Sequence, residues 1–147
     1  MVAYSFNRQF ARPIREGIKK HTLRRPRKRH ARAGEQLQLY VGMRTKQCFK
    51  IMDDPVCTGV SDIRLSFGDW DCRLFGEDRR LVTVDNAITE ILVDGIPLEL
   101  EEMQSLAVAD GFLLNEGWTG LQALYAMSRF WTNAHGAKPW EGVMIKW

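Results

Sequence analysis

The stretch that most constrains this chain is residues 19–34, KKHTLRRPRKRHARAG. It contains eight lysines or arginines and two histidines, and it contains no acidic residue. So many like charges are costly to bury, so we expect residues 27–34 to form a polar loop. Two interpretations are open for such a run: a solvated loop, or a surface that contacts the phosphates of a nucleic acid.

Charge is divided unevenly along the chain. Residues 1–50 hold 14 Lys or Arg against two acids, and residues 51–147 hold 7 against 16. The two parts therefore carry +12 and −9, which sum to the overall +3. This separation indicates a surface that faces a polyanion. The alternative is that the acidic part folds back and neutralises the basic part.

The composition is that of an ordinary globular protein. Its 147 residues, 45% hydrophobic and 27% charged, suit one domain with one core. No apolar run approaches the roughly 20 residues that span a bilayer, and the first ten residues lack the apolar region of a secretory signal. The three cysteines form no CxxC pair and the three histidines are scattered. We therefore expect a cytoplasmic protein with reduced thiols that binds no membrane, metal or cofactor.

The hydrophobic pattern predicts an α+β fold. Phe10, Ile14 and Ile18 recur at spacing four, which predicts a short helix over residues 9–20. Longer helices are predicted over residues 97–110 and 119–131, the second with a capping box of Thr119 and Gln122. Strands are predicted over residues 2–6, 21–25, 34–42, 44–52 and 140–147. Residues 53–95 predict several short antiparallel strands, with residues 67–80 as an excursion between them.

Residues 19–24 contain the side chains best suited to chemistry. A threonine hydroxyl becomes a nucleophile when a neighbouring base takes its proton, and Lys19 and Thr22 could form such a pair. They meet only if the helix ends near Lys19 and the chain turns before Thr22. In an extended segment, Thr22 and Arg24 face the same side. The like charges next to Lys19 disfavour its charged form, as a base requires.

Asp110 departs from the pattern of its predicted helix. A carboxylate at a helix C-terminus faces the negative end of the dipole. Either Asp110 is exposed, where the cost is small, or it meets a cation from elsewhere in the fold. Lys19 would be a suitable partner.

The remaining candidates are binding residues. Arginine makes bidentate contacts with phosphate that lysine cannot make. Tyr40 falls on the polar side of its predicted strand, where it could stack on a base. The candidate substrate-binding or RNA-binding residues are Lys20, Arg24, Arg25, Arg27, Lys28, Arg29, Tyr40, Arg44 and Lys46.

Three segments, PIREGIKKHTLRR, GEQLQLYVGMRTKQC and LAVADGF, resemble the ASCH domain of the PUA-like superfamily. The usual pattern is a helix ending in Gly-x-Lys, a strand with Thr and Arg, a Gly-Asp-x-Leu strand, and an acidic-Gly-Phe segment before a final helix. The matching positions are Gly17, Lys19, Thr22, Arg24, Gly34-Glu35, Leu37 and Asp110-Gly111-Phe112. Residues 53–95 match poorly, so we expect an extended insertion there within a single domain of residues 1–147.

The resemblance implies a PUA-like, mostly antiparallel β-barrel with flanking helices and a basic cleft. One compact branch looks like small amidohydrolases that deacetylate N4-acetylcytidine with a Lys, a Thr and a Glu. By this resemblance Lys19 is the base, Thr22 the nucleophile and Asp110 the acid partner, and Arg24 helps to hold substrate. The acid is Asp here, one methylene shorter than Glu, and the Lys19-Lys20 doublet leaves two possible registers.

The leading hypothesis is therefore an ASCH-domain protein that binds RNA or a modified nucleoside, with hydrolysis of an N4-acetylcytidine-like amide as its candidate reaction. One alternative is a non-catalytic RNA-binding module, for which Arg24 to Arg32 matter and Thr22 does not. Another is an RNA-cleaving enzyme in which Lys19 and Tyr40 act on the phosphodiester. Since one fold supports many reactions, the resemblance alone does not choose between them.

Overall fold

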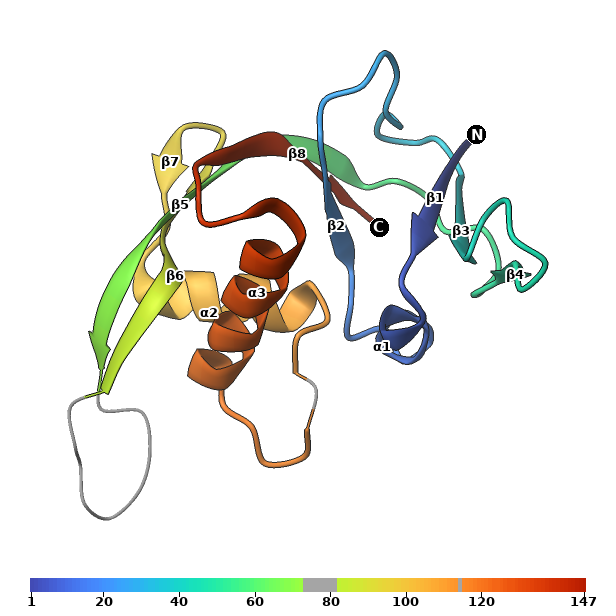
Figure 1. Ribbon diagram of the computed structural model, residues 1–147. Coiled ribbons are helices and arrows are strands. Elements are labelled where there is room, and N and C mark those ends of the chain that lie inside the picture. The colour runs from blue at the N-terminus through green and yellow to red at the C-terminus, as the bar shows by residue number, and fades with distance from the viewer. Residues whose placement is uncertain (73–81, 114) are drawn as a thin grey trace.

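The computed structural model describes residues 1–72, 82–113 and 115–147. Its strands form two sheets, of order β1-β3-β4 and β2-β8-β5-β6-β7 (Figure 1). The small sheet contains β1 (Val2–Phe6), β3 (Leu37–Val41) and β4 (Phe49–Lys50). The large sheet contains β2 (His21–Arg24), β8 (Trp140–Lys146), β5 (Gly59–Cys72), β6 (Val82–Val93) and β7 (Ile96–Pro97). The helices are α1 (Ala11–Arg15), preceded by a 3-10 turn (Arg8–Phe10), α2 (Leu100–Ala109) and α3 (Gly120–His135).

The predicted α+β class is confirmed, but the expected closed barrel is not. In the described part of the chain, no hydrogen-bonded ladder joins the two sheets. The reason is that β1 and β2 are both edge strands: β1 pairs only with β3, in parallel, and β2 pairs only with β8. The two sheets therefore meet without closing.

The small sheet follows the predicted alternation. Leu37, Leu39 and Val41 are buried, and the residues between them are half-buried. The prediction of a second strand over residues 44–52 was largely wrong, because only Phe49–Lys50 pair with β3. A turn occupies the preceding residues: Arg44 has a left-handed φ of 68°, and the Thr45 hydroxyl donates to the carbonyl of Gly42 at 2.7 Å.

The large sheet is dominated by the β5–β6 hairpin rather than by several short strands. The ladder of this hairpin shifts register twice, at Ser66/Phe67 and at Gly68/Trp70. Both strands continue through these irregularities, whereas the sequence pattern had predicted that the strands end there. The predicted excursion of residues 67–80 is strand up to Cys72, and residues 73–80 lie outside the described part.

Helix α1 is shorter than the pattern predicted. It ends at Arg15, because Gly17 adopts a left-handed φ of 70°. The next two amides, of Ile18 and Lys19, then both donate to the carbonyl of Pro13, at 2.9 and 3.0 Å. The chain thus turns sharply between α1 and β2, as the pairing of Lys19 with Thr22 would require.

Helix α3 is fixed at both ends. The predicted capping box of Thr119 and Gln122 is present at its N-terminus. Further along, the Ser128 hydroxyl accepts from the amide of Ile88 at 2.9 Å, and the Thr132 hydroxyl donates to the carbonyl of Asn86 at 3.0 Å. These bonds hold the C-terminal half of α3 against β6. None of the helices in the described residues has an apolar stretch that could cross a membrane.

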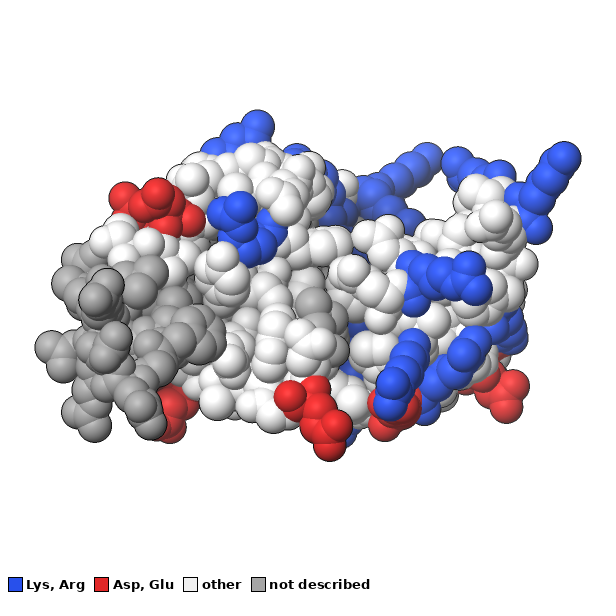
Figure 2. All heavy atoms as spheres, turned by 60° about the horizontal axis from the view of Figure 1, so that its bottom comes forward, with Lys and Arg blue, Asp and Glu red and all other residues white. Residues whose placement is uncertain are grey.

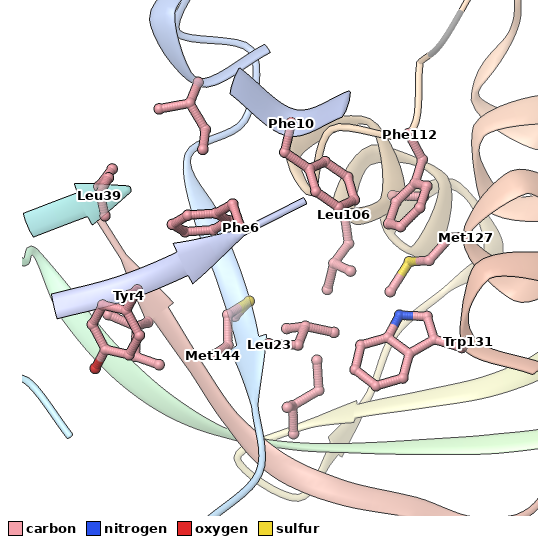
Figure 3. Packing of buried hydrophobic residues seen from close by; sticks show 14 of the residues in the cluster. Tyr4, Phe6, Phe10, Leu23, Leu39, Leu106, Phe112, Met127, Trp131 and Met144 are labelled. Atoms are coloured by element: carbon pink, nitrogen blue, oxygen red, sulfur yellow. The ribbon is translucent and has the colours of Figure 1, made fainter. Parts of the chain in front are cut away.

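One hydrophobic cluster joins both sheets and all the helices (Figure 3). Helices α2 and α3 pack against each other below the arch of β5 and β8 (Figure 1). The cluster includes Tyr4, Phe6, Phe10, Leu23, Leu39, Leu106, Phe112, Met127, Trp131 and Met144. The space between the edge strands β1 and β2 is thus closed by side chains instead of by backbone pairing.

Gly142 should be the least replaceable glycine of the large sheet. A Cβ there would lie 2.3 Å from the backbone oxygen of Arg24 and 2.4 Å from the Trp140 ring, so β2 would have to move away from β8. We expect Gly142→Ala to lower the free energy of unfolding by about 1–3 kcal/mol or more, measured by urea denaturation. Gly59→Ala is the matched control, because its Cβ would meet only the flexible end of Lys146, at 3.4 Å. Equal stability of the two variants would contradict this account.

Candidate functional site

A cavity of about 200 Å³ lies where the edge strands β1 and β2 meet α3 and the end of α2. Three parts of the chain line it: the end of β1 and the turn after it, the residues from Lys19 to Arg24, and residues 110–135 of the helical region. The lining residues are Ser5, Phe6, Asn7, Phe10, Lys19, Thr22, Leu23, Arg24, Asp110, Phe112, Phe130, Trp131, Ala134 and His135. The candidate set of Lys19, Thr22, Asp110 and Arg24 is therefore gathered in one cavity.

Lys19 and Asp110 form a buried ion pair. The Lys19 Nζ lies 2.6 Å from Asp110 Oδ1 and donates at the same distance to the backbone oxygen of Asp110. The two residues are 3% and 4% exposed. The sequence left open whether Asp110 is exposed or paired with a cation, and the structure shows that it is paired. The charge of Lys19 compensates a carboxylate that faces the negative end of the α2 dipole.

The turn after α1 decides which lysine of the doublet enters the cavity. The amide of Lys20 donates to the carbonyl of Ala109 at 2.9 Å, so the backbone here runs against the C-terminus of α2. This contact directs Lys19 inward and leaves Lys20 exposed, beside a different groove with Gly17 and Ala109. Lys20 therefore does not lie where it could contact a molecule bound in the cavity of Lys19, although it was predicted to bind the substrate.

Burial lowers the pKa of the Lys19 amine. Loss of hydration is the largest cause, the carboxylate of Asp110 acts in the opposite direction, and the nearby Arg24 lowers the pKa further. The Lys19 Nζ also lies 4.7 Å from the centroid of the Phe10 ring. A lysine in such surroundings gives up its proton more readily than an exposed one, which suits a base.

Gly111 allows the close approach between α2 and Lys19. Its φ of 93° is left-handed, and a Cβ there would lie 3.1 Å from both the Lys19 side chain and the Phe10 ring. The Asp-Gly-Phe segment thus turns the chain directly out of α2, with the carboxylate on Lys19 and with Phe112 beside Phe10 at a centroid distance of 5.4 Å.

Thr22 and Arg24 share a face of β2, as predicted. The Arg24 Nε donates to the Thr22 hydroxyl at 3.1 Å, and its guanidinium also donates to the backbone oxygen of Ser5 at 2.7 Å. The guanidinium carbon lies 4.9 Å from the centroid of Phe6. Among the described residues, the hydrogen bond of the Thr22 hydroxyl goes to Arg24 and not to Lys19. Arg24 therefore orients this hydroxyl and provides positive charge beside it.

His21 is a neighbour of the ion pair that the sequence did not single out. Its Nε2 is buried without a hydrogen-bond partner in the described part and lies 3.5 Å from Asp110 Oδ1. Burial is the largest cause that lowers the pKa of His21, to about 4. The charge of Asp110 acts in the opposite direction, and the charges of Lys19 and Lys146 offset part of its effect. The ring is therefore neutral at neutral pH, and the carboxylate of Asp110 remains committed to Lys19.

The basic segment after β2 is an ordered loop outside the cavity. Ala31 is buried, and both its amide and the His30 ring bond to the Tyr4 hydroxyl, at 3.1 and 3.3 Å. Of the eight cations in residues 19–34, only Lys19 and Arg29 form ion pairs with described residues, with Asp110 and Glu35. The acidic residues that the structure describes thus leave most of this charge without an ion-pair partner. Figure 2 shows Lys and Arg side chains gathered over the end of the molecule that the N-terminal elements form.

Not all of the predicted binding residues face the cavity. Tyr40 pairs with Ser5 and Lys50 in the small sheet, on the face opposite to Tyr4 and Phe6, and does not line the cavity. Arg44 and Lys46 are in the turn after β3, and Arg25, Arg27, Lys28 and Arg29 are exposed in the basic loop. Arg27 covers the outer side of the Tyr4 ring at 4.7 Å. None of these residues lines the cavity that holds Lys19, Thr22 and Asp110.

Aromatic residues make up much of the cavity wall. Phe112, Phe130 and Trp131 were expected to pack the core; they do so and also line the cavity with Phe6 and Phe10. Figure 3 shows four of these five rings: Phe6, Phe10, Phe112 and Trp131. The Trp131 Nε1 is buried without a hydrogen-bond partner among the described residues.

Two further findings bear on identity. Among the described residues, no three His, Cys, Asp or Glu side chains are grouped so that they could hold a metal ion. No family model matches this chain, and no curated protein and no solved structure is significantly similar to it. The site therefore has to be interpreted from its own geometry.

The depressed pKa of His21 predicts acid sensitivity. Its pKa is 6.5 when the residue is exposed and about 4 in the folded protein, so the unfolded state binds more protons between these values. Stability should therefore fall by up to about 3 kcal/mol as pH drops from 7 to 4. Urea denaturation of wild type and His21→Gln across this range measures the effect. The variant should show a shallower dependence on pH, and an unchanged slope would contradict the assignment.

Proposed function

We propose that this chain is an ASCH domain of the PUA-like superfamily that hydrolyses an exocyclic amide on a modified nucleoside of the N4-acetylcytidine type. The observation that carries the proposal is the convergence of Lys19, Thr22 and Asp110 in one cavity. These residues occupy the positions that correspond to the Lys-Thr-acid set of the amidohydrolase branch. Two cysteines of this chain, Cys48 and Cys57, are unpaired and suit a reducing compartment. We therefore propose the cytoplasm as the site of action.

The proposed reaction gives one role to each polar group that lines the cavity. Thr22 Oγ attacks the acyl carbon, and its proton passes to the neutral Nζ of Lys19. When the tetrahedral intermediate collapses, the C–N bond breaks and the proton moves from Lys19 to the leaving amine nitrogen. Water then cleaves the ester on Thr22, which releases the carboxylic acid and restores the hydroxyl.

Two neighbours assist this sequence. Asp110 stabilises the lysinium that forms at each proton transfer, because its carboxylate is 2.6 Å from Nζ. Arg24 donates to the Thr22 oxygen, so its charge favours the negative charge that develops there during attack. The lowered pKa of Lys19 is in the direction that a neutral base requires.

The size and lining of the cavity support a single planar group as the ligand. Its volume of about 200 Å³ is below the roughly 300–1,000 Å³ of sites for drug-sized molecules. A single base with a small acyl group is a ligand of this class, whereas a duplex is not. The phenyl rings that line the cavity offer faces for stacking.

A second candidate function is a non-catalytic RNA-binding module. It is favoured by one specific observation: Lys19 bonds to Asp110 and Thr22 bonds to Arg24, so the lysine and the hydroxyl are each engaged with another partner. The exposed cations of the basic loop would then provide most of the affinity. Such binding weakens steeply as salt is raised.

Substitution of Thr22 separates the two functions. We expect Thr22→Val to reduce kcat/KM for N4-acetylcytidine hydrolysis by about 100-fold or more, since the nucleophile is lost while the shape is kept. Thr22→Ser should retain measurable activity. The matched control is Thr89→Val, because this residue on β6 is exposed and its hydroxyl donates to the carbonyl of Ser66, away from the cavity. Full activity of Thr22→Val would exclude Thr22 as the nucleophile. Salt-sensitive RNA binding without turnover, unchanged by Thr22→Val, would instead favour the module.

A further inference from the structure

The carboxylate of Asp110 has two basic side chains beside it among the described residues. Lys19 Nζ lies 2.6 Å from Asp110 Oδ1, and His21 Nε2 lies 3.5 Å from the same oxygen. The lysine contact has the short length of a charge-assisted bond, whereas the histidine contact is longer than a formed hydrogen bond. Asp110 is therefore bonded to one basic neighbour and has a second one close by.

His21 is held on the side of β2 opposite to Thr22. In the ladder between β2 and β8 it is paired with Lys146, whose Nζ donates to the Ser61 hydroxyl at 3.1 Å. The side chain of His21 is 8% exposed, and its Nε2 has no hydrogen-bond partner in the part of the chain that the structure describes. A buried polar atom without a partner is costly and rare, so this nitrogen calls for a physical explanation.

The surroundings of His21 determine where its ring carries a proton. Burial keeps the ring neutral at neutral pH; the charges of Lys19 and Lys146 act in the same direction, and the charge of Asp110 opposes them. A neutral imidazole carries one proton, on one of its two nitrogens. An unprotonated Nε2 would place a lone pair beside the carboxylate of Asp110, which repels it. The favoured tautomer therefore has its proton on Nε2, and His21 is a neutral donor beside Asp110.

A neutral Lys19 leaves the charge of Asp110 in need of a new partner. A base must be in its neutral form before it accepts a proton. When Lys19 is neutral, the buried carboxylate loses its compensating charge, which is costly. Arg24 lines the same cavity, but its hydrogen bonds go to the Thr22 hydroxyl and to a backbone carbonyl. After Lys19, His21 is thus the nearest basic side chain to this carboxylate among the described residues.

We propose that His21 is a positioning residue: its Nε2–H donates to the Asp110 carboxylate when Lys19 is neutral, and so stabilises the form of Lys19 that acts as the base. This inference rests on the proposed function for the role of Lys19. One proton leaves Lys19 Nζ for solvent and one hydrogen bond forms, with no change in covalent bonds. The contact of 3.5 Å, beside a lysine bonded at 2.6 Å, corresponds to the charged form of Lys19.

The tautomer of His21 can be measured in the wild type without substrate. Long-range 1H–15N NMR correlation spectra show which ring nitrogen is protonated, and His21→Gln assigns the signals. We expect the proton on Nε2, and we expect its signal to move downfield as Lys19 becomes neutral, because the hydrogen bond to Asp110 then shortens. A proton on Nδ1 would overturn the inference.

Two variants of His21 measure its effect on Lys19. His21→Phe keeps a ring and removes the donor, so the pKa of Lys19 should rise above its wild-type value. The value of kcat/KM for N4-acetylcytidine should then fall about tenfold at neutral pH and recover as pH is raised, with little change in KM. His21→Gln is the matched control: its amide nitrogen can still donate to Asp110, so the pKa of Lys19 should stay close to the wild-type value.

The outcomes separate a positioning role from a structural one. An unchanged pKa of Lys19 in His21→Phe, or an equal rise in both variants, would overturn the inference, because the ring would then act through packing alone. Activity of His21→Phe that stays low at every pH would also contradict it. Should His21→Phe fail to fold, the tautomer in the wild type still decides. Failure of the proposed function looks different: the wild type would not hydrolyse N4-acetylcytidine, although the pKa of Lys19 would still respond to His21→Phe.

Discussion

The ion pair between Lys19 and Asp110 is the interaction on which the rest of the site depends. It joins residues 91 positions apart and ties the turn before β2 to the end of α2. Removing one partner of a buried pair leaves the other charge without compensation, which costs about 3–5 kcal/mol in comparable cases. The pair therefore fixes β2 relative to the helices, and with β2 it fixes Thr22 and Arg24. Gly111 favours this approach, because its φ is left-handed and a Cβ there would lie 3.1 Å from both the Lys19 and the Phe10 side chains.

The two open edges of the sheets explain where the cavity lies. A closed barrel would fill the space between β1 and β2 with backbone hydrogen bonds. Here the two strands are edges, and Arg24 joins them through its bond to the carbonyl of Ser5. The cavity thus has a polar floor on β2 and aromatic walls from β1 and α3. Water is largely excluded from the floor, which strengthens the electrostatic interactions of Lys19, Asp110 and Arg24.

The sequence predicted which residues come together at the floor of the cavity better than it predicted the strands and walls around them. Lys19 and Thr22 were identified because they are three positions apart in one short segment, and Asp110 because a carboxylate is unusual at a helix C-terminus. The capping box of Thr119 was identified because it is local. Tyr40 was assigned to the polar side of β3 correctly, but no local pattern shows on which side of the molecule that face lies. The cavity residue His135 was missed because it is more than 100 positions along the chain from Lys19, Thr22 and Arg24, with which it lines the cavity. The length of β5 and β6 was also missed, since the register shifts of their ladder resemble turns in a single sequence.

The central claim is that Lys19 is a buried amine whose pKa is depressed so that it can act as a base. The most direct measurement is an NMR titration of the lysine side chains, followed at the Cε and Nζ atoms of Lys19 and assigned with Lys19→Arg. The account predicts that Lys19 titrates below the ordinary lysine value of about 10.4, in the direction that burial imposes. A pKa at or above that value would contradict it, because the ion pair with Asp110 would then keep Lys19 charged and unable to accept a proton.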